Sequence, residues 1–224
     1  MGSNWLTLFI DSFPKILIPG LTRTIPLTVI SFSIAMIIAV LTAMAQYAHI
    51  PVLSQIIRFY IWVFRGTPLL VQLFIVFYGL PKVGILIDPF PAAVIVFSLN
   101  EGAYDSETMR AALESVPVGQ MEAGYCVGMT YMQIMRRIIL PQAMRTAFPS
   151  LSNSLIAMVK STSLAANITV TEMFMTTQRI VARTYEPLLL YLEVGWIYLI
   201  FSTLLTFLQS WGEKRLGAYM EKEA

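Results

Sequence analysis

The chain has 224 residues, of which 57% are apolar and only 12% are charged, and its formal net charge is +2 at pH 7. An average soluble domain carries roughly 25% charged residues, so this composition cannot cover the surface of a water-soluble globule. We therefore expect an integral membrane protein. Cytosolic enzymes are largely excluded, and the small net charge gives no field that would attract nucleic acid.

Counts of single residue types exclude several kinds of site. Cys126 is the only cysteine and His49 the only histidine, so no internal disulfide can form and no metal site of the zinc type is expected. No Gly-Lys dipeptide occurs, so the chain lacks the lysine of a phosphate-binding P-loop. We predict no catalytic residue and no cofactor, and any ATP would be hydrolysed by a partner. We interpret Cys126 as a small buried side chain.

Hydrophobic runs in chain order predict about five transmembrane helices and hence an all-α integral membrane fold. A span needs about 20 apolar residues, because the hydrocarbon core is about 30 Å thick. The predicted spans cover residues 22–48, 56–80, 92–113, 142–166 and 186–211. Residues 1–20 are expected to form a short amphipathic helix at the interface. Residues 213–224 form a charged cytoplasmic tail, and we interpret 1–224 as a single transmembrane domain.

Lysine and arginine residues near the span ends favour an N-terminus outside and a C-terminus in the cytoplasm. In this orientation nine of the 15 basic residues lie inside or near the inner surface: Arg58, Arg65, Arg110, Arg136, Arg137, Arg145, Lys214, Arg215 and Lys222. The bias is small, and the arginines around residues 114–141 supply most of it.

The segment 114–141, between the third and fourth spans, predicts two short helices joined by a tight turn. Gly128 is suited to a left-handed stop after the first helix. Thr130 and Gln133 have the spacing of a capping box that begins the second helix. Pro141 is expected to prevent simple continuation of that helix. From the physics alone, an elbow that docks on another protein and an ordinary cytoplasmic loop are about equally favoured.

Polar residues within the third span form two stripes. One contains Asn100, Tyr104 and Glu107, and the other contains Glu101 and Asp105. Such residues are costly in lipid and usually face protein or water, so a stripe could line a path for a polar substrate. The alternative is structural, since Glu107 lies three residues before an arginine and the two could form an ion pair on the helix.

Other polar positions allow both a structural and a functional interpretation. Residues 65–68, which include Thr67, could form a local kink or a gate, and the kink is favoured because Pro68 removes a backbone hydrogen bond. Gln72 could pack or contact substrate. The hydroxyls of Ser161 and Thr162 could bind substrate or cap a helix. We interpret residues 167–185 as an external, solvated helix face and a candidate docking surface for a binding protein.

The segment 114–141 resembles the "EAA" loop of bacterial ABC-importer permeases. The family pattern is Glu-Ala-Ala, three residues, Gly, nine residues, Ile, one residue and Leu-Pro, and this chain matches it at Glu122, Ala123, Gly128, Ile138, Leu140 and Pro141. Gly124 departs from the pattern, because an alanine is usual there. A glycine inside a helix costs about 1 kcal/mol relative to alanine. The residue stays small, so we expect docking to survive.

Further motifs are similar to the polar-amino-acid branch of that family, the histidine/glutamine type. They are Phe64-Arg65-Gly66-Thr67-Pro68-Leu69 with Gln72, then Asn100, Ala103-Tyr104, Glu107 and Arg110, and finally Asn153, Lys160 and Thr162-Ser163-Leu164. The resemblance covers about residues 20–212. Its motifs are specific in combination, and a cystine-like cargo is among the candidates.

The resemblance implies a permease subunit of an ATP-binding-cassette importer in the bacterial inner membrane. Its partners would be an ATP-binding subunit, a second permease subunit that is identical or homologous, and an extracytoplasmic substrate-binding protein. The residues expected to couple to the ATPase are Glu122, Ala123, Gly124, Gly128, Ile138, Leu140 and Pro141. The residues expected to line the path of a polar amino acid are Thr67, Gln72, Asn100, Glu101, Tyr104, Ser161 and Thr162.

An alternative from another class is an ion- or proton-coupled secondary carrier, or a channel subunit, with Glu101 and Asp105 as titrating groups. Such a protein would not need a partner, and its transport would follow the membrane potential rather than ATP. No obvious inverted repeat is visible in the hydrophobic segments, which makes the carrier less favoured.

Overall fold

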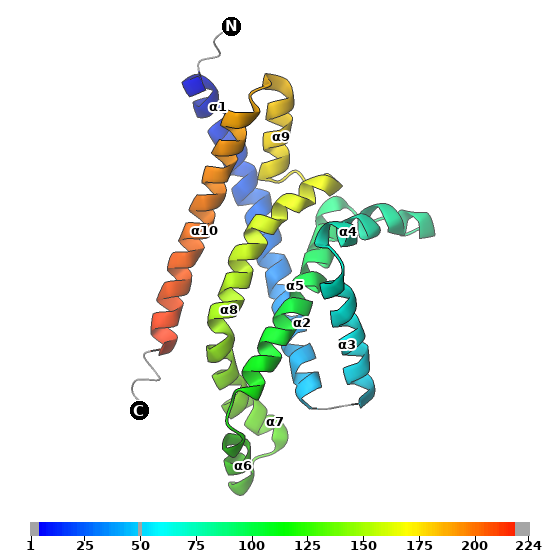
Figure 1. Ribbon diagram of the computed structural model, residues 1–224, viewed down its shortest axis with the longest axis vertical. Coiled ribbons are helices and arrows are strands. Elements are labelled where there is room, and N and C mark those ends of the chain that lie inside the picture. Colours follow the sequence, from blue (N-terminus) through cyan, green and yellow to red (C-terminus); the bar gives the residue numbers. More distant parts are fainter. Residues whose placement is uncertain (1–4, 49–50, 218–224) are drawn as a thin grey trace. The chain divides into compact units, whose positions relative to one another are not determined.

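The computed structural model describes residues 5–48 and 51–217, in which all regular structure is helical (Figure 1). The all-α prediction is confirmed. The longer helices are α1 (Trp5–Pro19), α2 (Ile25–Tyr47), α3 (Pro51–Gly66), α5 (Pro89–Glu114), α8 (Leu140–Ser161), α9 (Met173–Thr184) and α10 (Pro187–Gly217). The shorter helices are α4 (Leu69–Phe74), α6 (Val118–Cys126) and α7 (Tyr131–Ile134). The predicted tail beyond residue 217 and the first four residues of the N-terminal segment lie outside the described residues.

Two helical stretches among the described residues, Trp5–Tyr47 and Pro187–Arg215, are long and apolar enough to cross a bilayer. A third candidate is the bent pair Pro51–Gly66 and Leu69–Val83. The predicted third and fourth spans form the helices α5 and α8. Both carry charged residues within their length, as helices packed inside a membrane bundle can. The total of about five spans stays a prediction.

The N-terminal segment and the first span form one continuous helix of 43 residues. Where α1 passes into α2, the residues Gly20–Thr24 form a π-helical turn, in which the N–H of Ile25 donates to the carbonyl of Gly20. The wider turn ends two residues before Pro26, which has no N–H to donate. No break separates the predicted interfacial helix from the span, although its place at the interface stays a prediction.

The second predicted span is not one straight helix. The chain bends by 104° between Pro51–Gly66 and Leu69–Val83. Pro68 lies at the bend with extended backbone angles (φ −64°, ψ 136°) and precedes the first residue of α4. The predicted span over residues 56–80 is a bent pair of helices, and the favoured interpretation of residues 65–68 as a kink is confirmed.

The described residues fall into two compact units. Unit 1 contains residues 5–33, 68–98 and 155–208, and unit 2 contains residues 34–48, 51–67, 99–154 and 209–217. Unit 1 has two apolar clusters. One is built around Leu27, Leu73, Val96, Phe97 and Ile168, and the other around Ile16, Met173, Leu190, Ile197 and Phe201.

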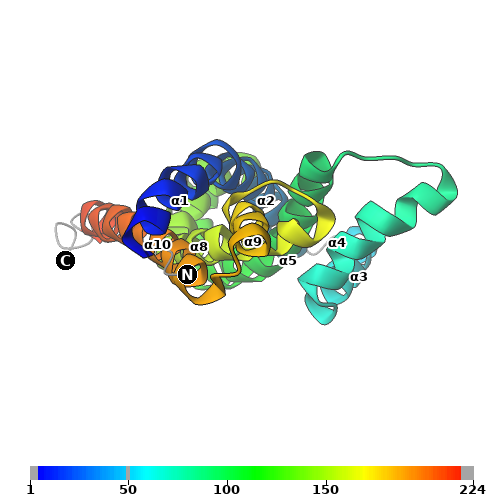
Figure 2. The same ribbon diagram turned by 90° about the horizontal axis from the view of Figure 1, so that it is seen from above.

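Glu172 holds the start of α9 inside unit 1, where α9 packs against α1 (Figure 2). Its carboxylate is fully buried and accepts the backbone N–H groups of Phe174 at 2.8 Å and Met175 at 2.7 Å, as well as the hydroxyl of Tyr198 at 3.1 Å. Burial raises the pKa of Glu172, and the backbone donors oppose that rise. The predicted solvated face is therefore wrong for Glu172, whereas Arg179 on α9 is exposed.

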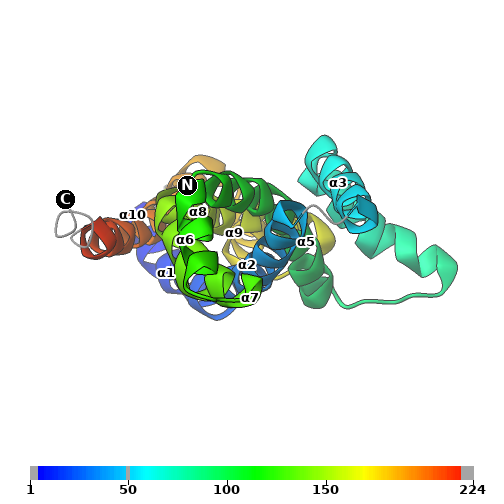
Figure 3. The ribbon, with the colours of Figure 1, turned by 90° about the horizontal axis from the view of Figure 1, so that it is seen from below.

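The core of unit 2 joins residues from four helices, and α2 and α5 are far in the sequence from α7 and α8. Ala43 of α2, Leu113 of α5, Ile134 of α7 and Ala143 of α8 all belong to one buried cluster. α6 and α7 lie at the end of this unit that faces the viewer in Figure 3. The segment between α5 and α8 is thus part of a packed core and is not a loose loop.

Candidate functional site

The segment between α5 and α8 folds as the local sequence predicts. Pro117 directly precedes α6, which ends at Cys126. Gly128 then adopts a left-handed conformation with φ +77°, which glycine tolerates without strain. The hydroxyl of Thr130 accepts the backbone N–H of Gln133, and the side chain of Gln133 accepts the N–H of Thr130 at 2.9 Å. The turn and the capping box are confirmed.

Gly124 fixes the distance between α6 and α7. It is buried, and a Cβ atom placed on it would lie 2.6 Å from Cγ1 of Ile134. This contact gives a physical reason for the departure from the Glu-Ala-Ala pattern, since an alanine here would overlap with the β-branched side chain of Ile134. Gly124 therefore packs inside the segment, while its neighbours Glu122 and Ala123 are exposed.

Pro141 does not end the second helix, so this expectation is wrong. Residues Met135–Ile139 form a π-helical turn in which the N–H of Leu140 donates to the carbonyl of Met135. The wider turn lets the chain continue into α8 past Pro141, which has no N–H and would otherwise crowd the preceding turn. Pro141 is exposed, and Ile138 and Leu140 are half-buried against the core of unit 2.

Apolar side chains on the outside of the segment are open to solvent. Val127 is 75% exposed, Val118 72%, Met132 61% and Tyr125 51%. Together with Glu122 and Ala123 these four residues are called the outer face below. Cys126 lies between Tyr125 and Val127 and is exposed, so its interpretation as a buried side chain is wrong.

Tyr131, at the start of α7, has a raised pKa, because it is partly buried and the phenol groups of Tyr47 and Tyr125 lie nearby. It stays protonated at neutral pH and contributes no charge to the outer face.

Three of the predicted path residues meet at the end of α3, where they cap it. The hydroxyl of Thr67 donates to the carbonyl of Val63 at 2.8 Å. From α5, the amide of Asn100 donates to the carbonyl of Phe64 at 3.2 Å, and the hydroxyl of Tyr104 to that of Arg65 at 3.5 Å. The last carbonyls of a helix lack partners within the helix, so these side chains supply what the bend at Pro68 removes.

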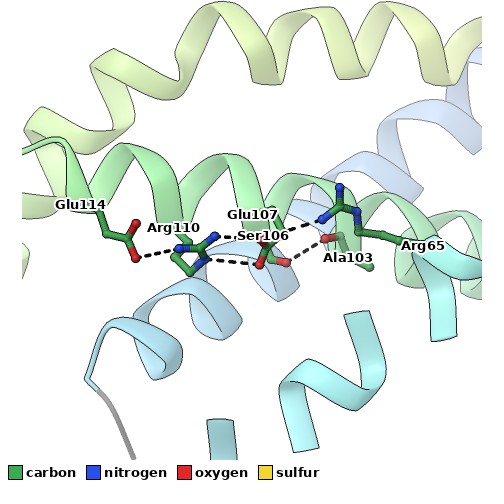
Figure 4. A network of polar contacts seen from close by, with 6 residues as sticks. All are labelled: Arg65, Ala103, Ser106, Glu107, Arg110 and Glu114. Carbon is green, nitrogen blue, oxygen red and sulfur yellow. Dashed lines mark hydrogen bonds and ion pairs between the residues drawn. The ribbon is translucent and has the colours of Figure 1, made fainter. Parts of the chain in front are cut away.

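One turn further along α5, four charged residues form a ladder in unit 2 (Figure 4). Glu107 accepts from Arg110 at 2.9 Å and lies 3.9 Å from Arg65, and Arg110 also donates to Glu114 at 2.7 Å. The guanidinium of Arg65 stacks 5.2 Å from the ring centre of Tyr104. The structural interpretation of Glu107 and Arg110 as an ion pair is confirmed. Because the side chains are partly exposed, each pair contributes only about 0.2–1 kcal/mol.

The second stripe of α5 faces α8 within unit 2. Asp105 is buried and one of its carboxylate oxygens accepts the hydroxyl of Ser154 at 2.7 Å. Its other oxygen has no hydrogen-bond partner among the described residues. Glu101 is half-buried one turn earlier on the same side of α5. This stripe is thus separate from the one that caps α3.

The remaining predicted path residues belong to unit 1. Gln72 is buried on α4. The hydroxyl of Ser161 donates to the carbonyl of Ala157 at 3.1 Å, and that of the fully buried Thr162 to Val159 at 2.6 Å. The expected juxtaposition of these residues with Asn100 and Tyr104 stays a prediction.

Sequence reasoning missed a cavity of about 470 Å³ in unit 1. Lys160, Ser163, Phe174, Tyr191 and Tyr198 line it. A signal was present, because Tyr191 and Tyr198 are seven residues apart and so share one face of α10. For metals, no group of three or more His, Cys, Asp or Glu side chains that could hold an ion occurs in the part of the chain that the structure describes.

Comparisons with known proteins identify the family to which this chain belongs. Residues 35–218 match the family model of the binding-protein-dependent transport system inner membrane component. The chain belongs to this family. It is 49% identical to the L-cystine transport system permease protein TcyB of Bacillus subtilis over 95% of this chain and 91% of that protein. It is 42% identical to the probable amino-acid ABC transporter permease protein PatM of Vibrio harveyi, over 90% and 92% of the two chains.

Comparison with solved structures also shows similarity to ABC transporters. A chain from the crystal structure of an amino acid ABC transporter with histidines has a TM-score of 0.85 and 31% identity, over 96% of this chain and all of that one. The MetNI methionine ABC transporter, at 19% identity and a TM-score of 0.74, shares the fold. The resemblance to ABC-importer permeases is confirmed, so the chain is a membrane-embedded permease subunit. The secondary carrier is not supported.

Proposed function

We propose that this permease forms one half of the translocation path for a polar amino acid and couples to a separate ATPase through the outer face of α6 and α7. The second half would be an identical or homologous permease subunit, and an extracytoplasmic binding protein would deliver the cargo. The observation that carries the coupling is a firmly packed segment with an exposed apolar surface, at the residues of the Glu-Ala-Ala pattern.

The outer face has the character of a protein-binding surface. Val118 and Val127 are more than 70% exposed, although both are apolar. Contiguous apolar patches on a water-facing surface usually mark contacts with other proteins. Gly124 against Ile134, the capping box and the shared core of unit 2 hold this face in one shape. A rigid contact of this kind can transmit motion, because packed interfaces switch between discrete arrangements.

Cystine is the cargo to test first, because the similarity to the L-cystine transport system permease protein of Bacillus subtilis extends over nearly the whole chain. In proteoliposomes that hold the permease, its ATP-binding subunit and the binding protein, labelled cystine should accumulate only with ATP. Accumulation without nucleotide, driven by an ion gradient, would contradict the proposal. Accumulation of another amino acid in place of cystine would contradict the cargo alone.

We propose that α6 lies in the cytoplasm and the N-terminus outside. Cys126 is the only cysteine and is exposed, so the native chain carries its own label site. A membrane-impermeant maleimide should modify Cys126 in inside-out vesicles and leave it unmodified in intact cells. As the matched control, Cys126→Ser combined with Thr171→Cys at an exposed external position should give the opposite result. Labelling of Cys126 from outside would reverse the orientation.

The labelling rate of Cys126 also measures docking of the ATP-binding subunit. Binding of the ATP-binding subunit should slow the labelling of Cys126 by at least about tenfold, because its neighbours on the outer face become covered. Glu122→Lys should abolish this protection, whereas Gln178→Lys, on the exposed side of α9, should leave it intact. Unchanged protection in Glu122→Lys would contradict the role of the outer face.

A further inference from the structure

A second cavity lies in unit 2, and its lining includes neither the residues that cap α3 nor those of the outer face. Its volume is about 600 Å³. It is formed where the end of α2, residues 51–62 of α3 and the last turns of α5 meet. Its polar and charged lining residues are Gln46, Ser54, Arg58, Glu107, Arg110 and Glu114, and Trp62 also lines it. Because α2 and α5 meet α6 and α7 in the core of this unit, the cavity lies toward the same end of unit 2.

The charges in this cavity are only partly used by the protein. All three guanidinium nitrogens of Arg110 donate within the protein, two of them to Glu107 and one to Glu114. Glu114 uses one carboxylate oxygen for that bond, and its other oxygen has no partner among the described residues. Arg58 has no ionic or hydrogen-bonding partner in the described part of the chain.

Among the described residues, the cavity therefore offers one unpaired cation, Arg58, and one carboxylate, Glu114, with an oxygen left over from its ion pair with Arg110. Both residues are exposed to an incoming ligand. The two arginines and two glutamates of the lining balance in formal charge. A ligand that matches must therefore carry an anionic oxygen group for Arg58 and an N–H-bearing cation for Glu114. Guanidinium–phosphate and ammonium–carboxylate contacts are the strong, charge-assisted kind.

The surface beside the cavity indicates which kind of zwitterionic ligand would bind in it. Along α3, Val52, Ile56, Phe59 and Trp62 are each more than 60% exposed, although all are apolar. In a chain embedded in a bilayer such a face is covered by acyl chains, and a tryptophan next to an arginine is typical of the headgroup level. A free amino acid would leave this face without a partner.

We propose that this cavity binds the headgroup of phosphatidylethanolamine, with the phosphate on Arg58, the ammonium on Glu114 and the acyl chains along the apolar face of α3. The proposal requires only that the chain is embedded in a membrane. It does not depend on which cargo is carried or on how the ATPase docks.

Native mass spectrometry of the purified permease, exchanged into detergent with equal amounts of three phospholipids, tests the site. The wild type should retain phosphatidylethanolamine about tenfold better than phosphatidylglycerol, which has no ammonium, and phosphatidylcholine, whose quaternary ammonium has no N–H for Glu114. Arg58→Gln should lose the retained lipid. Glu114→Gln should keep phospholipid but lose the preference for the ethanolamine headgroup. Arg179→Gln, an exposed arginine on α9, should behave as the wild type.

Three results would overturn the proposal: equal retention of the three lipids by the wild type, wild-type retention by Arg58→Gln, or displacement of bound phosphatidylethanolamine by millimolar glutamine or cystine. The last result would assign the cavity to a free amino acid. The lipid comparison uses the unaltered chain, so it holds even if a variant fails to fold, and gel filtration identifies such a variant.

Discussion

Two prolines, Pro68 and Pro141, follow helical segments of similar character and have opposite effects. At Pro68 the chain turns by 104°, whereas at Pro141 the helix continues. Before Pro141 one extra residue widens the turn, and the backbone stays bonded to itself. Before Pro68 the helix ends, and donors from Thr67, Asn100 and Tyr104 take its free carbonyls. A proline therefore bends a helix where other side chains can satisfy the exposed backbone.

Of the changes at the bend at Pro68, loss of the Asn100 amide should lower the stability the most. Asn100→Leu removes a buried amide that donates to the half-buried Phe64, and should lower the free energy of unfolding by about 2 kcal/mol. Thermal unfolding in detergent micelles measures the change. Asn153→Leu, at an exposed position of α8, is the matched control and should change stability by less than about 0.5 kcal/mol. Equal losses in both variants would show that the cap is unimportant.

Substitution of Gly124 tests whether α7 is held by close packing against α6. Gly124→Ala should cost about 1–2 kcal/mol, because the new Cβ meets Ile134. Gly119→Ala on the same helix has open space around it and should be neutral or slightly stabilising. The double variant Gly124→Ala/Ile134→Ala should lose less stability than the two single changes together. Additive losses would contradict direct contact.

Removal of the other proline should uncouple the segment without unfolding it. In Pro141→Ala the π-helical turn can relax to an α-helix, which turns the preceding residues by about 100° relative to α8. We expect ATP-driven uptake to fall by about tenfold while the unfolding temperature changes little. Pro149→Ala, within α8, serves as the control. Wild-type uptake in Pro141→Ala would mean that the rotation of the preceding residues relative to α8 is irrelevant to coupling.

The smallest effect is expected for Tyr104→Phe. The hydroxyl bond to the carbonyl of Arg65 is long, at 3.5 Å, and the ring that stacks on Arg65 remains. A loss of about 0.5 kcal/mol in unfolding free energy is expected, measured as for Asn100→Leu. A loss as large as that of Asn100→Leu would show that the two caps act as one unit.

The sequence predicts most of the helices and the local chemistry of the α6–α7 segment, because caps and turns depend on neighbours in the chain. Gly128 and Thr130 were therefore predictable. The fate of Pro141 was not, since a single inserted residue in the preceding turn reverses its effect. Likewise the burial of Glu172 and the exposure of Cys126 depend on packing between distant segments.

The candidate path illustrates the same limit. Asn100 and Tyr104 were predicted as path residues from their polar character in a membrane span, and Thr67 as part of a kink or gate. Three bonds to the end of α3 account for these polar side chains. Periodicity placed Asn100 and Tyr104 on one stripe, but it could not reveal that this stripe meets helix carbonyls. The cavity around Lys160 escaped notice because its lining comes from α8, α9 and α10.

Three π-helical turns lie at the same spacing before a proline. Gly20–Thr24, Ile75–Gly79 and Met135–Ile139 each end two residues before a proline, namely Pro26, Pro81 and Pro141. A proline lacks an N–H and crowds the preceding turn, and a widened turn two residues earlier relieves that crowding without ending the helix. Pro149 lies inside α8 without such a turn, so the ring alone does not create the offset. We expect these three turns to keep their offset in any conformational change of the permease, because their spacing from a proline is fixed in the sequence.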